Sequence, residues 1–288
     1  MIAGEFEYFA PKTLPEALRL LNERGNDCKL LAGGMTLVPI MTLGLAQPAA
    51  VISLNHLPGL DAVEDVGSAL RLGAMMRHAA IAVHPLVLQH APLLAAAARA
   101  IGDVQVRHRG TLGGSLAHAE PAADYLCATA TLAARFQLQK EGRERWLDAT
   151  EFFVDVMTTA LEPDELLTAV EIPKQAAGSG HAHQSLRRVE GAFPIVLASA
   201  QIAPRYTAAR IGLGGVGPRP VVLDVGDLVQ GGVTPAALEG VGARAFDAAA
   251  QALSDLNGSG EYRRAMARVY ARRALEEAAA ALGAGGSR

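Results

Sequence analysis

Residues 29–39 read Lys29-Leu30-Leu31-Ala32-Gly33-Gly34-Met35-Thr36-Leu37-Val38-Pro39, and residues 109–124 read Arg109-Gly110-Thr111-Leu112-Gly113-Gly114-Ser115-Leu116-Ala117-His118-Ala119-Glu120-Pro121-Ala122-Ala123-Asp124. In each stretch a pair of glycines stands beside a small hydroxyl residue. Glycine lacks a Cβ atom, so the backbone at such a pair can turn sharply and bring its N–H groups close to a ligand. Successive N–H groups in a turn form a concavity that binds anions, and a helix N-terminus adds a favourable dipole. The two stretches together predict a clamp on a pyrophosphate group.

The two glycine stretches and their flanks resemble one family along nearly the whole chain. A single Gly-Gly pair is common in ordinary turns of a chain with 30 glycines, so the specificity lies in having both stretches. Further matching segments are 6–8, 105–107, 170–173, 214–217 and 272–275. In these residues the chain resembles the FAD-binding medium subunit of the molybdenum hydroxylases. That family includes bacterial carbon monoxide dehydrogenase, nicotine dehydrogenase and xanthine dehydrogenase.

The resemblance implies a set of FAD-binding residues. In the family, the two glycine stretches hold the pyrophosphate and the ribityl chain, and the counterpart of Asp124 contacts the ribityl chain or the ring edge. Ile101 and Phe193 stand where the family places apolar or aromatic groups against the isoalloxazine ring. The cofactor-binding residues expected on this basis are Lys29, Leu30, Leu31, Ala32, Gly33, Gly34, Met35, Thr36, Ile101, Thr111, Leu112, Gly113, Gly114, Ser115, Asp124, Leu167 and Phe193.

The chain departs from the family pattern in two places. Many members carry Gln or His followed by Ser where this chain has Met35 and Thr36, so a side-chain hydrogen bond is lost while the backbone cradle is kept. Many relatives also carry a flavin-contacting lysine near position 184, and this chain has His183 and Gln184 instead. We therefore expect the electrostatic environment of the flavin to differ from that of those relatives.

The residues by themselves leave other roles open for two of these side chains. Asp124 stands directly before Tyr125 and Leu126, where a carboxylate can cap a helix. Phe193 precedes an apolar run that begins at Ile195, so it is equally suited to pack in a core.

The order of the elements predicts an α+β protein of two domains. The resemblance implies that residues 1–176 form an FAD-binding domain of the PCMH type, made of two α/β parts with the flavin between them. Residues 177–288 are expected to form a smaller domain with a three-stranded antiparallel sheet and helices. Thr13 and Glu16 make a capping box that starts a helix ending near Gly25, and a hairpin joins 131–139 to 144–147. Further strands are expected at 28–32, 50–54, 68–74, 165–173, 182–189, 194–203 and 208–214, and further helices at 78–89, 92–101, 235–251 and 261–282.

Composition excludes several classes of function. A net charge of −3 argues against a nucleic-acid-binding surface, and no apolar run is long enough for a transmembrane helix. The acidic start lacks the apolar core of a signal peptide. Cys28 and Cys127 are isolated from each other and from any metal-binding motif, which is typical of a reduced cytoplasmic protein. Because a [2Fe–2S] cluster needs four thiolates, any such cluster must lie on another polypeptide.

The resemblance implies that the chain is the FAD-carrying electron-transfer subunit of a heterotrimeric oxidoreductase. A large subunit would hold the molybdenum cofactor and hydroxylate an N-heteroaromatic, a purine, an aldehyde or carbon monoxide. A small subunit would hold two [2Fe–2S] clusters, whose electrons pass through FAD to an external acceptor. No acid–base catalytic residue and no metal site are expected in this chain. Two alternatives stay open: a stand-alone flavin-dependent oxidase or reductase of the same flavin-binding superfamily, and a structural subunit without flavin.

Overall fold

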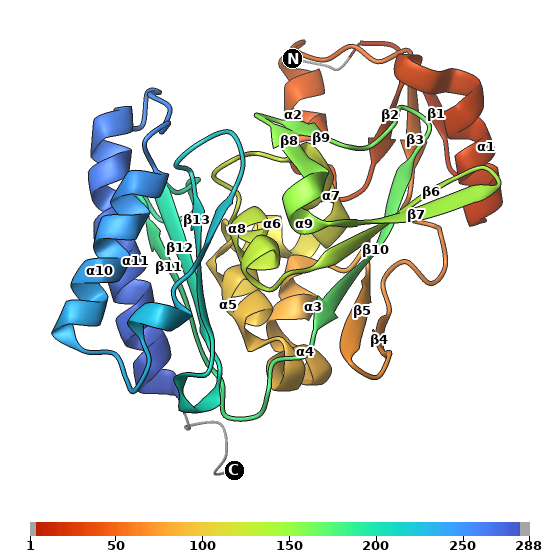
Figure 1. Ribbon diagram of the computed structural model, residues 1–288. Coiled ribbons are helices and arrows are strands. Elements are labelled where there is room, and N and C mark those ends of the chain that lie inside the picture. Colours follow the sequence, from red (N-terminus) through yellow and green to blue (C-terminus); the bar gives the residue numbers. More distant parts are fainter. Residues whose placement is uncertain (1–3, 283–288) are drawn as a thin grey trace.

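The computed structural model describes residues 4–282, so the first three residues of the acidic start lie outside it. Figure 1 shows three layered regions that follow one another along the chain, from a small unit at the N-terminus to a sheet with two long helices at the C-terminus. Together they confirm the predicted α+β class, with a two-part N-terminal region and a C-terminal antiparallel sheet covered by helices.

The N-terminal unit is a small parallel sheet with helices. Its strands β1 (Glu7–Phe9), β2 (Cys28–Leu31) and β3 (Ala50–Ser53) lie in the order β1-β3-β2. Helix α1 (Leu14–Arg24) begins as the capping box predicts, because the Thr13 hydroxyl accepts a hydrogen bond from the Glu16 amide. The helix ends at Gly25, which has a φ of +52°. Helix α2 (Leu37–Thr42) follows the first glycine pair.

The second unit is a five-stranded antiparallel sheet with helices packed against it. The strands are β4 (Val63–Asp65), β5 (Ala69–Gly73), β10 (Leu166–Pro173), β6 (Arg135–Lys140) and β7 (Arg143–Asp148), in the order β4-β5-β10-β6-β7. The helices are α3 (His78–Val83), α4 (Pro85–His90), α5 (Pro92–Ala100), α6 (Val104–Arg109), α7 (Leu112–His118) and α8 (Asp124–Thr131). The short elements α9 (Ala149–Phe152), β8 (Phe153–Asp155) and β9 (Thr158–Thr159) lie between β7 and β10.

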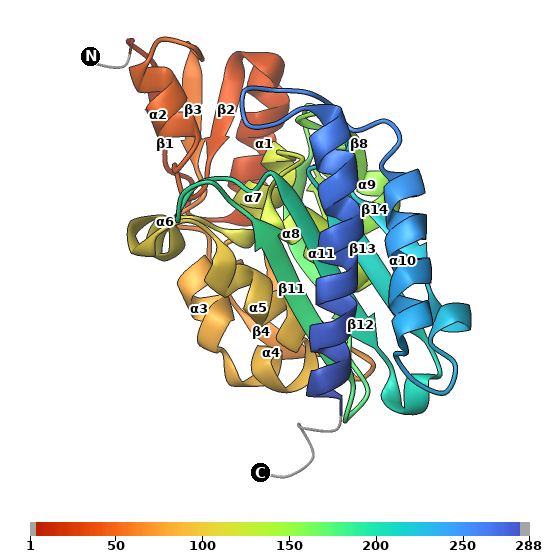
Figure 2. The same ribbon diagram turned by 90° about the vertical axis from the view of Figure 1, so that its left-hand side faces the viewer.

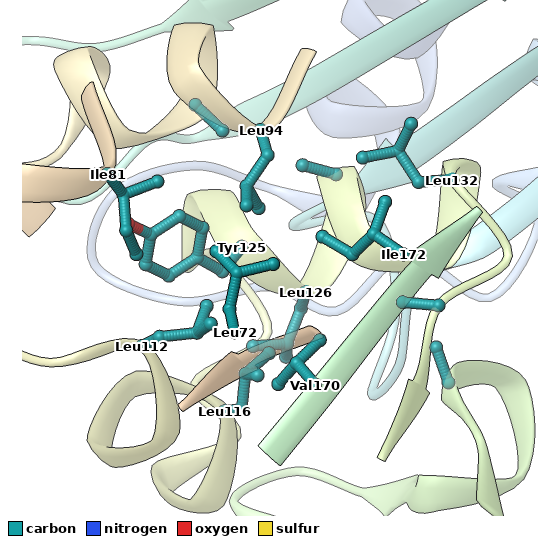
Figure 3. Packing of buried hydrophobic residues seen from close by; sticks show 14 of the residues in the cluster. Leu72, Ile81, Leu94, Leu112, Leu116, Tyr125, Leu126, Leu132, Val170 and Ile172 are labelled. Atoms are coloured by element: carbon teal, nitrogen blue, oxygen red, sulfur yellow. The ribbon is translucent and has the colours of Figure 1, made fainter. Parts of the chain in front are cut away.

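The core of this unit joins two consecutive helices, α7 and α8, to strand β10, which comes much later in the chain. Figure 3 shows Leu112 and Leu116 of α7 packed with Tyr125 and Leu126 of α8, against Val170 and its neighbours on β10. All five of these side chains are fully buried. The buried face of α7 therefore fixes where the second glycine pair lies.

The C-terminal unit is an antiparallel sheet between two layers of helices. Its strands β11 (Gly180–Leu186), β12 (Val196–Ile202), β13 (Ala209–Gly214) and β14 (Val221–Asp224) lie in sequence order, so the sheet has one short strand more than the three expected. Helices α10 (Pro235–Ala248) and α11 (Gly260–Ala281) cover one face, while α5 and α8 pack on the other (Figures 1 and 2). The expected helix 78–89 is two helices instead, because Pro85 lacks an N–H and begins α4 after α3 has ended.

Candidate functional site

A cavity lies where the glycine stretches of the first two units meet. It has a volume of about 600 Å³. Its walls come from the loop between β2 and α2, the start of α7, the segment before β10 and the loop between β11 and β12. A cavity of this size is typical of sites for cofactors and other small molecules.

The cavity brings together nearly all the residues predicted from the sequence. Leu31 and Leu112 are the two that do not line it, and the other fifteen do. Leu112 is fully buried in the core on the inner face of α7, as Figure 3 shows. Leu31 is half-buried at the end of β2, next to Gly34. These two side chains therefore pack beneath the loops and do not face the cavity.

The two glycine loops are in direct contact. A Cβ atom built on Gly33 would overlap the carbonyl oxygen of Arg109 and would lie 2.8 Å from Cα of Gly110. On the other side, a Cβ atom on Gly113 would lie 2.6 Å from Cβ of Ala74. Only glycine fits at these two positions without displacing backbone, so the glycines are required for close approach between segments.

A pair of polar side chains that the sequence analysis missed ties the two loops together. Nδ2 of Asn55 donates a 3.0 Å hydrogen bond to the carbonyl of Ala32 in the first loop. Arg77 donates from Nη2 to Oδ1 of Asn55 at 2.7 Å, and from Nη1 to the carbonyl of Arg109 in the second loop. Both residues lie outside the glycine stretches, so no local motif pointed to them.

The two loops differ in the backbone donors that they offer to a ligand. No described residue accepts a hydrogen bond from the N–H groups of 33–36. In the second loop, the first four N–H groups of α7 are already bonded to the carbonyls of Met76, Ala74 and Thr111 and to the Thr111 hydroxyl. The free backbone donors for an anion therefore come from the first loop, and the second contributes the half-buried hydroxyl of Ser115.

Asp124 lines the cavity with a buried carboxylate held by two basic side chains. Its Oδ1 atom accepts hydrogen bonds from Nη2 of Arg187 at 2.6 Å and from Nε2 of His183 at 3.0 Å. Nδ1 of His183 in turn lies 2.8 Å from the hydroxyl of Ser199. The helix-cap alternative is wrong, because Ala123 is the N-cap of α8 and Asp124 is its first residue. The partners of Asp124 lie far along the chain, so sequence reasoning did not find them.

The apolar residues expected near a flavin ring lie on the cavity wall. Phe193 is 57 % exposed, which rules out the alternative that it packs in the core, whereas its neighbours Ile195 and Val196 are buried. Ile101 is half-buried beside the core of the second unit. An exposed aromatic ring at the edge of a cavity is available to cover a ligand.

His78 is a further cavity residue that sequence reasoning missed. It is buried and meets the ring of Tyr125 edge-on, with 5.2 Å between the ring centroids. Burial lowers the pKa of His78 to about 4, so the imidazole is neutral at physiological pH. A Cβ atom on Gly110 would overlap this ring, which explains the glycine between α6 and the second glycine pair.

Other kinds of site have no counterpart in residues 4–282. No group of three His, Cys, Asp or Glu side chains there could hold a metal ion. None of the described helices is both long and apolar enough to cross a membrane. The spacing G-x-G-x-x-G does occur at 212–217, beginning inside β13, but the next element is β14 and not a helix, so this segment is not a dinucleotide loop.

Comparison with known proteins agrees with this geometry. Residues 4–175 match the family described as "FAD binding domain in molybdopterin dehydrogenase", and residues 181–278 match "CO dehydrogenase flavoprotein C-terminal domain". The chain is 36% identical to the carbon monoxide dehydrogenase medium chain of Hydrogenophaga pseudoflava, over 96% of this chain and 98% of that protein. It is also 36% identical to the nicotine 6-hydroxylase medium subunit of Paenarthrobacter nicotinovorans, over 95% and 97% of the two chains.

Solved structures show the same likeness in three dimensions. A chain of the Hydrogenophaga pseudoflava carbon monoxide dehydrogenase that lacks the Mo-pyranopterin moiety of its cofactor superposes with a TM-score of 0.91, at 34% identity, and the match covers 98% of this chain and 100% of that one. A chain of quinoline 2-oxidoreductase from Pseudomonas putida 86 gives a TM-score of 0.88 at 31% identity, covering 97% and 99%. The predictions of an FAD cofactor and of an oxidoreductase are therefore confirmed, and the chain belongs to the family of FAD-binding medium subunits of the molybdopterin dehydrogenases.

Proposed function

We propose that the cavity between the two glycine loops binds one FAD non-covalently, and that the chain passes electrons from iron–sulfur clusters through this FAD to an external acceptor. The observation that carries the proposal is the cradle at Gly33 and Gly34, where residues whose backbone N–H groups have no described acceptor line a cavity of about 600 Å³. A pyrophosphate is the part of FAD that such donors recognise.

The lining residues suggest how FAD would be held. The free N–H groups of 33–36 and the hydroxyl of Ser115 suit the pyrophosphate. Asp124, Ile101 and Phe193 suit the flavin ring and the ribityl chain, and Lys29, Leu30 and Leu167 complete the wall. When bound, the flavin supplies reversible electron uptake, and the protein supplies binding, orientation and partial exclusion of water.

The partners in this proposal are a large subunit with the molybdenum cofactor and a small subunit with two [2Fe–2S] clusters. Two buried free cysteines, Cys28 and Cys127, cannot ligate a cluster. The names of the similar proteins, medium chain and medium subunit, agree with such an assembly. The substrate belongs to the large subunit, and the proposal covers N-heteroaromatics, purines, aldehydes and carbon monoxide.

Two further parts of the proposal concern organisation. We place a domain boundary at residues 176–177, because one core cluster is built from buried residues of 182–278 and the others from buried residues of 17–172. We place the protein in the cytoplasm, where free thiols such as those of Cys28 and Cys127 persist.

The experiment that tests the electron-transfer role compares the isolated chain with the purified assembly. The assembly should contain molybdenum and iron by elemental analysis, and its flavin absorbance should bleach when substrate is added. The isolated chain, free of metal, should bind FAD but hydroxylate no substrate of the assembly. Hydroxylation by the metal-free chain would favour the stand-alone oxidase instead, and a colourless chain that takes up no FAD would favour a structural subunit.

A further inference from the structure

The loop between β11 and β12 reaches the cavity and carries Phe193. It is closed at its base by a 2.6 Å hydrogen bond from the Ile195 amide to the carbonyl of Leu186. Its tip approaches the backbone beside Ile101, because a Cβ atom on Gly191 would lie 4.0 Å from the backbone of residues 102 and 103. Within the loop, the amide of Ala192 bonds the carbonyl of Val189 at 3.3 Å. Residues 188–194 are called the Phe193 loop below.

One side chain at the base of the Phe193 loop makes three hydrogen bonds in three directions. Arg187 donates from Nε to the hydroxyl of Ser185 at 3.0 Å, from Nη1 to the carbonyl of Ala192 at 2.6 Å, and from Nη2 to Oδ1 of Asp124 at 2.6 Å. The guanidinium is planar and rigid, so holding one of these partners fixes the direction in which it presents donors to the others. The loop and the cavity carboxylate are thereby joined by a single group.

The ion pair between Arg187 and Asp124 is largely buried. The Asp124 side chain is 4% exposed and that of Arg187 is 14% exposed. A buried carboxylate is strongly destabilised without a charged partner. His183 is the second partner of the same oxygen atom, but it is bound to Ser199 and does not contact the Phe193 loop in the described hydrogen bonds. Arg187 is thus the group that couples the charge of Asp124 to the loop.

We infer that Arg187 is a positioning residue that holds Phe193 over one end of the cavity by latching the backbone of Ala192 to the carboxylate of Asp124. Arg187 itself does not line the cavity, whereas Phe193 and Asp124 both do. Arg187 therefore acts on the ligand through Phe193 and Asp124. The inference rests on the proposed function, since the ligand that Phe193 would cover is FAD.

The test uses the full chain, with and without FAD, and two readouts. Amide hydrogen exchange at Ala192 and Ile195 reports opening of the loop whether or not FAD binds. Quenching of the fluorescence of bound FAD by iodide reports access to the ring. Arg187→Met should speed exchange at these amides by about tenfold, the change expected from the loss of one charge-assisted hydrogen bond. The iodide quenching constant should rise in the same variant, because an open loop exposes the flavin ring to iodide.

Three further variants separate a positioning role from general damage. Arg188→Met is the matched control, because Arg188 is exposed and forms no described hydrogen bond or ion pair, and it should behave as wild type. Arg187→Lys can pair with Asp124 but cannot also reach Ala192, so it should keep FAD affinity while exchange still quickens. The double variant Arg187→Met with Asp124→Asn should exchange its loop amides little faster than Arg187→Met alone. Both substitutions remove the same contact, the ion pair between Arg187 and Asp124, so their effects on the loop should not add.

The outcomes distinguish the inference from the proposed function. Exchange and quenching in Arg187→Met that equal those of Arg188→Met would overturn the latch while leaving FAD binding intact. If Arg187→Met does not fold, Arg187→Lys answers the same question through loop exchange alone, and wild-type exchange in that variant would refute the latch. If the wild-type chain takes up no FAD, the proposed function fails, and the exchange data still decide whether Arg187 holds the loop.

Discussion

Arg77 donates a 2.7 Å hydrogen bond to the side chain of Asn55, and through this contact the carbonyl groups of Ala32 and Arg109 belong to one hydrogen-bonded chain. The spacing of the two glycine loops is therefore set by side chains outside both loops. A cavity whose walls are pre-positioned in this way binds its ligand without first ordering them.

Arg77→Met should weaken FAD binding by about tenfold, because a charge-assisted hydrogen bond that orders the cradle is lost. Equilibrium dialysis of the variant against FAD measures the change. Arg19→Met is a suitable control, since Arg19 forms an exposed ion pair with Glu23 on α1 and should leave FAD affinity unchanged. Equal affinities of Arg77→Met and wild type would show that the loops keep their spacing without this contact.

Gly33→Ala should lower the free energy of unfolding by about 1–3 kcal/mol and abolish tight FAD binding, because the added methyl group overlaps the backbone of the second loop. Urea denaturation and dialysis measure the two effects. Gly217→Ala makes the same chemical change where the nearest atom, the carbonyl oxygen of Arg219, is 4.0 Å away. This control should change neither the free energy of unfolding nor the affinity for FAD. A Gly33→Ala protein as stable as Gly217→Ala would contradict the close contact of the loops.

His78 should make stability depend on pH between about 4 and 6.5. Its pKa falls from 6.5 to about 4 on folding, because burial disfavours the imidazolium. Since the unfolded chain then binds more protons in this range, the contribution is fully present above pH 6.5 and is lost as pH falls toward 4. The loss attributable to His78 is about 3 kcal/mol.

Urea denaturation between pH 7.5 and 4.5 tests this assignment through a comparison of variants. Burial also lowers the pKa of His118 and of His181, so the wild-type slope contains more than one group. The difference between wild type and His78→Gln isolates the share of His78, and the slope should be shallower in the variant. Parallel curves for wild type and His78→Gln would show that His78 is not the group responsible.

The parts of the fold that local sequence signals control were predictable. Thr13 and Glu16 mark the start of α1 through a contact between near neighbours, and the glycine pairs mark the two loops because their backbone geometry excludes a Cβ atom. The break between α3 and α4 was also encoded locally, by Pro85, but the helical periodicity on both sides obscured it. Strand β14 was missed, although strands β2 and β3 of the same length were expected.

The parts of the site that depend on tertiary structure were not predictable from local patterns. For Asp124 the sequence left a helix-cap role open, but its carboxylate meets His183 of β11 and Arg187, the residue after that strand. Asn55 bonds the first loop within the N-terminal unit and Arg77 bonds the second loop within its own unit, and their mutual hydrogen bond forms only when the two units pack together. Phe193 could be distinguished from a core residue only once its exposure was known.

Titration of the flavin-free full chain with FAD, followed by acid precipitation, shows whether the cavity binds one FAD without a covalent bond. We expect saturation at one FAD per chain and release of all the flavin into the acid supernatant, because the cavity offers a non-covalent cradle at Gly33 and Gly34. Gly33→Ala should abolish the saturation, and Gly217→Ala should preserve it. Failure of the wild-type chain to bind FAD would refute the cofactor site, and flavin that stays with the precipitated protein would refute non-covalent binding.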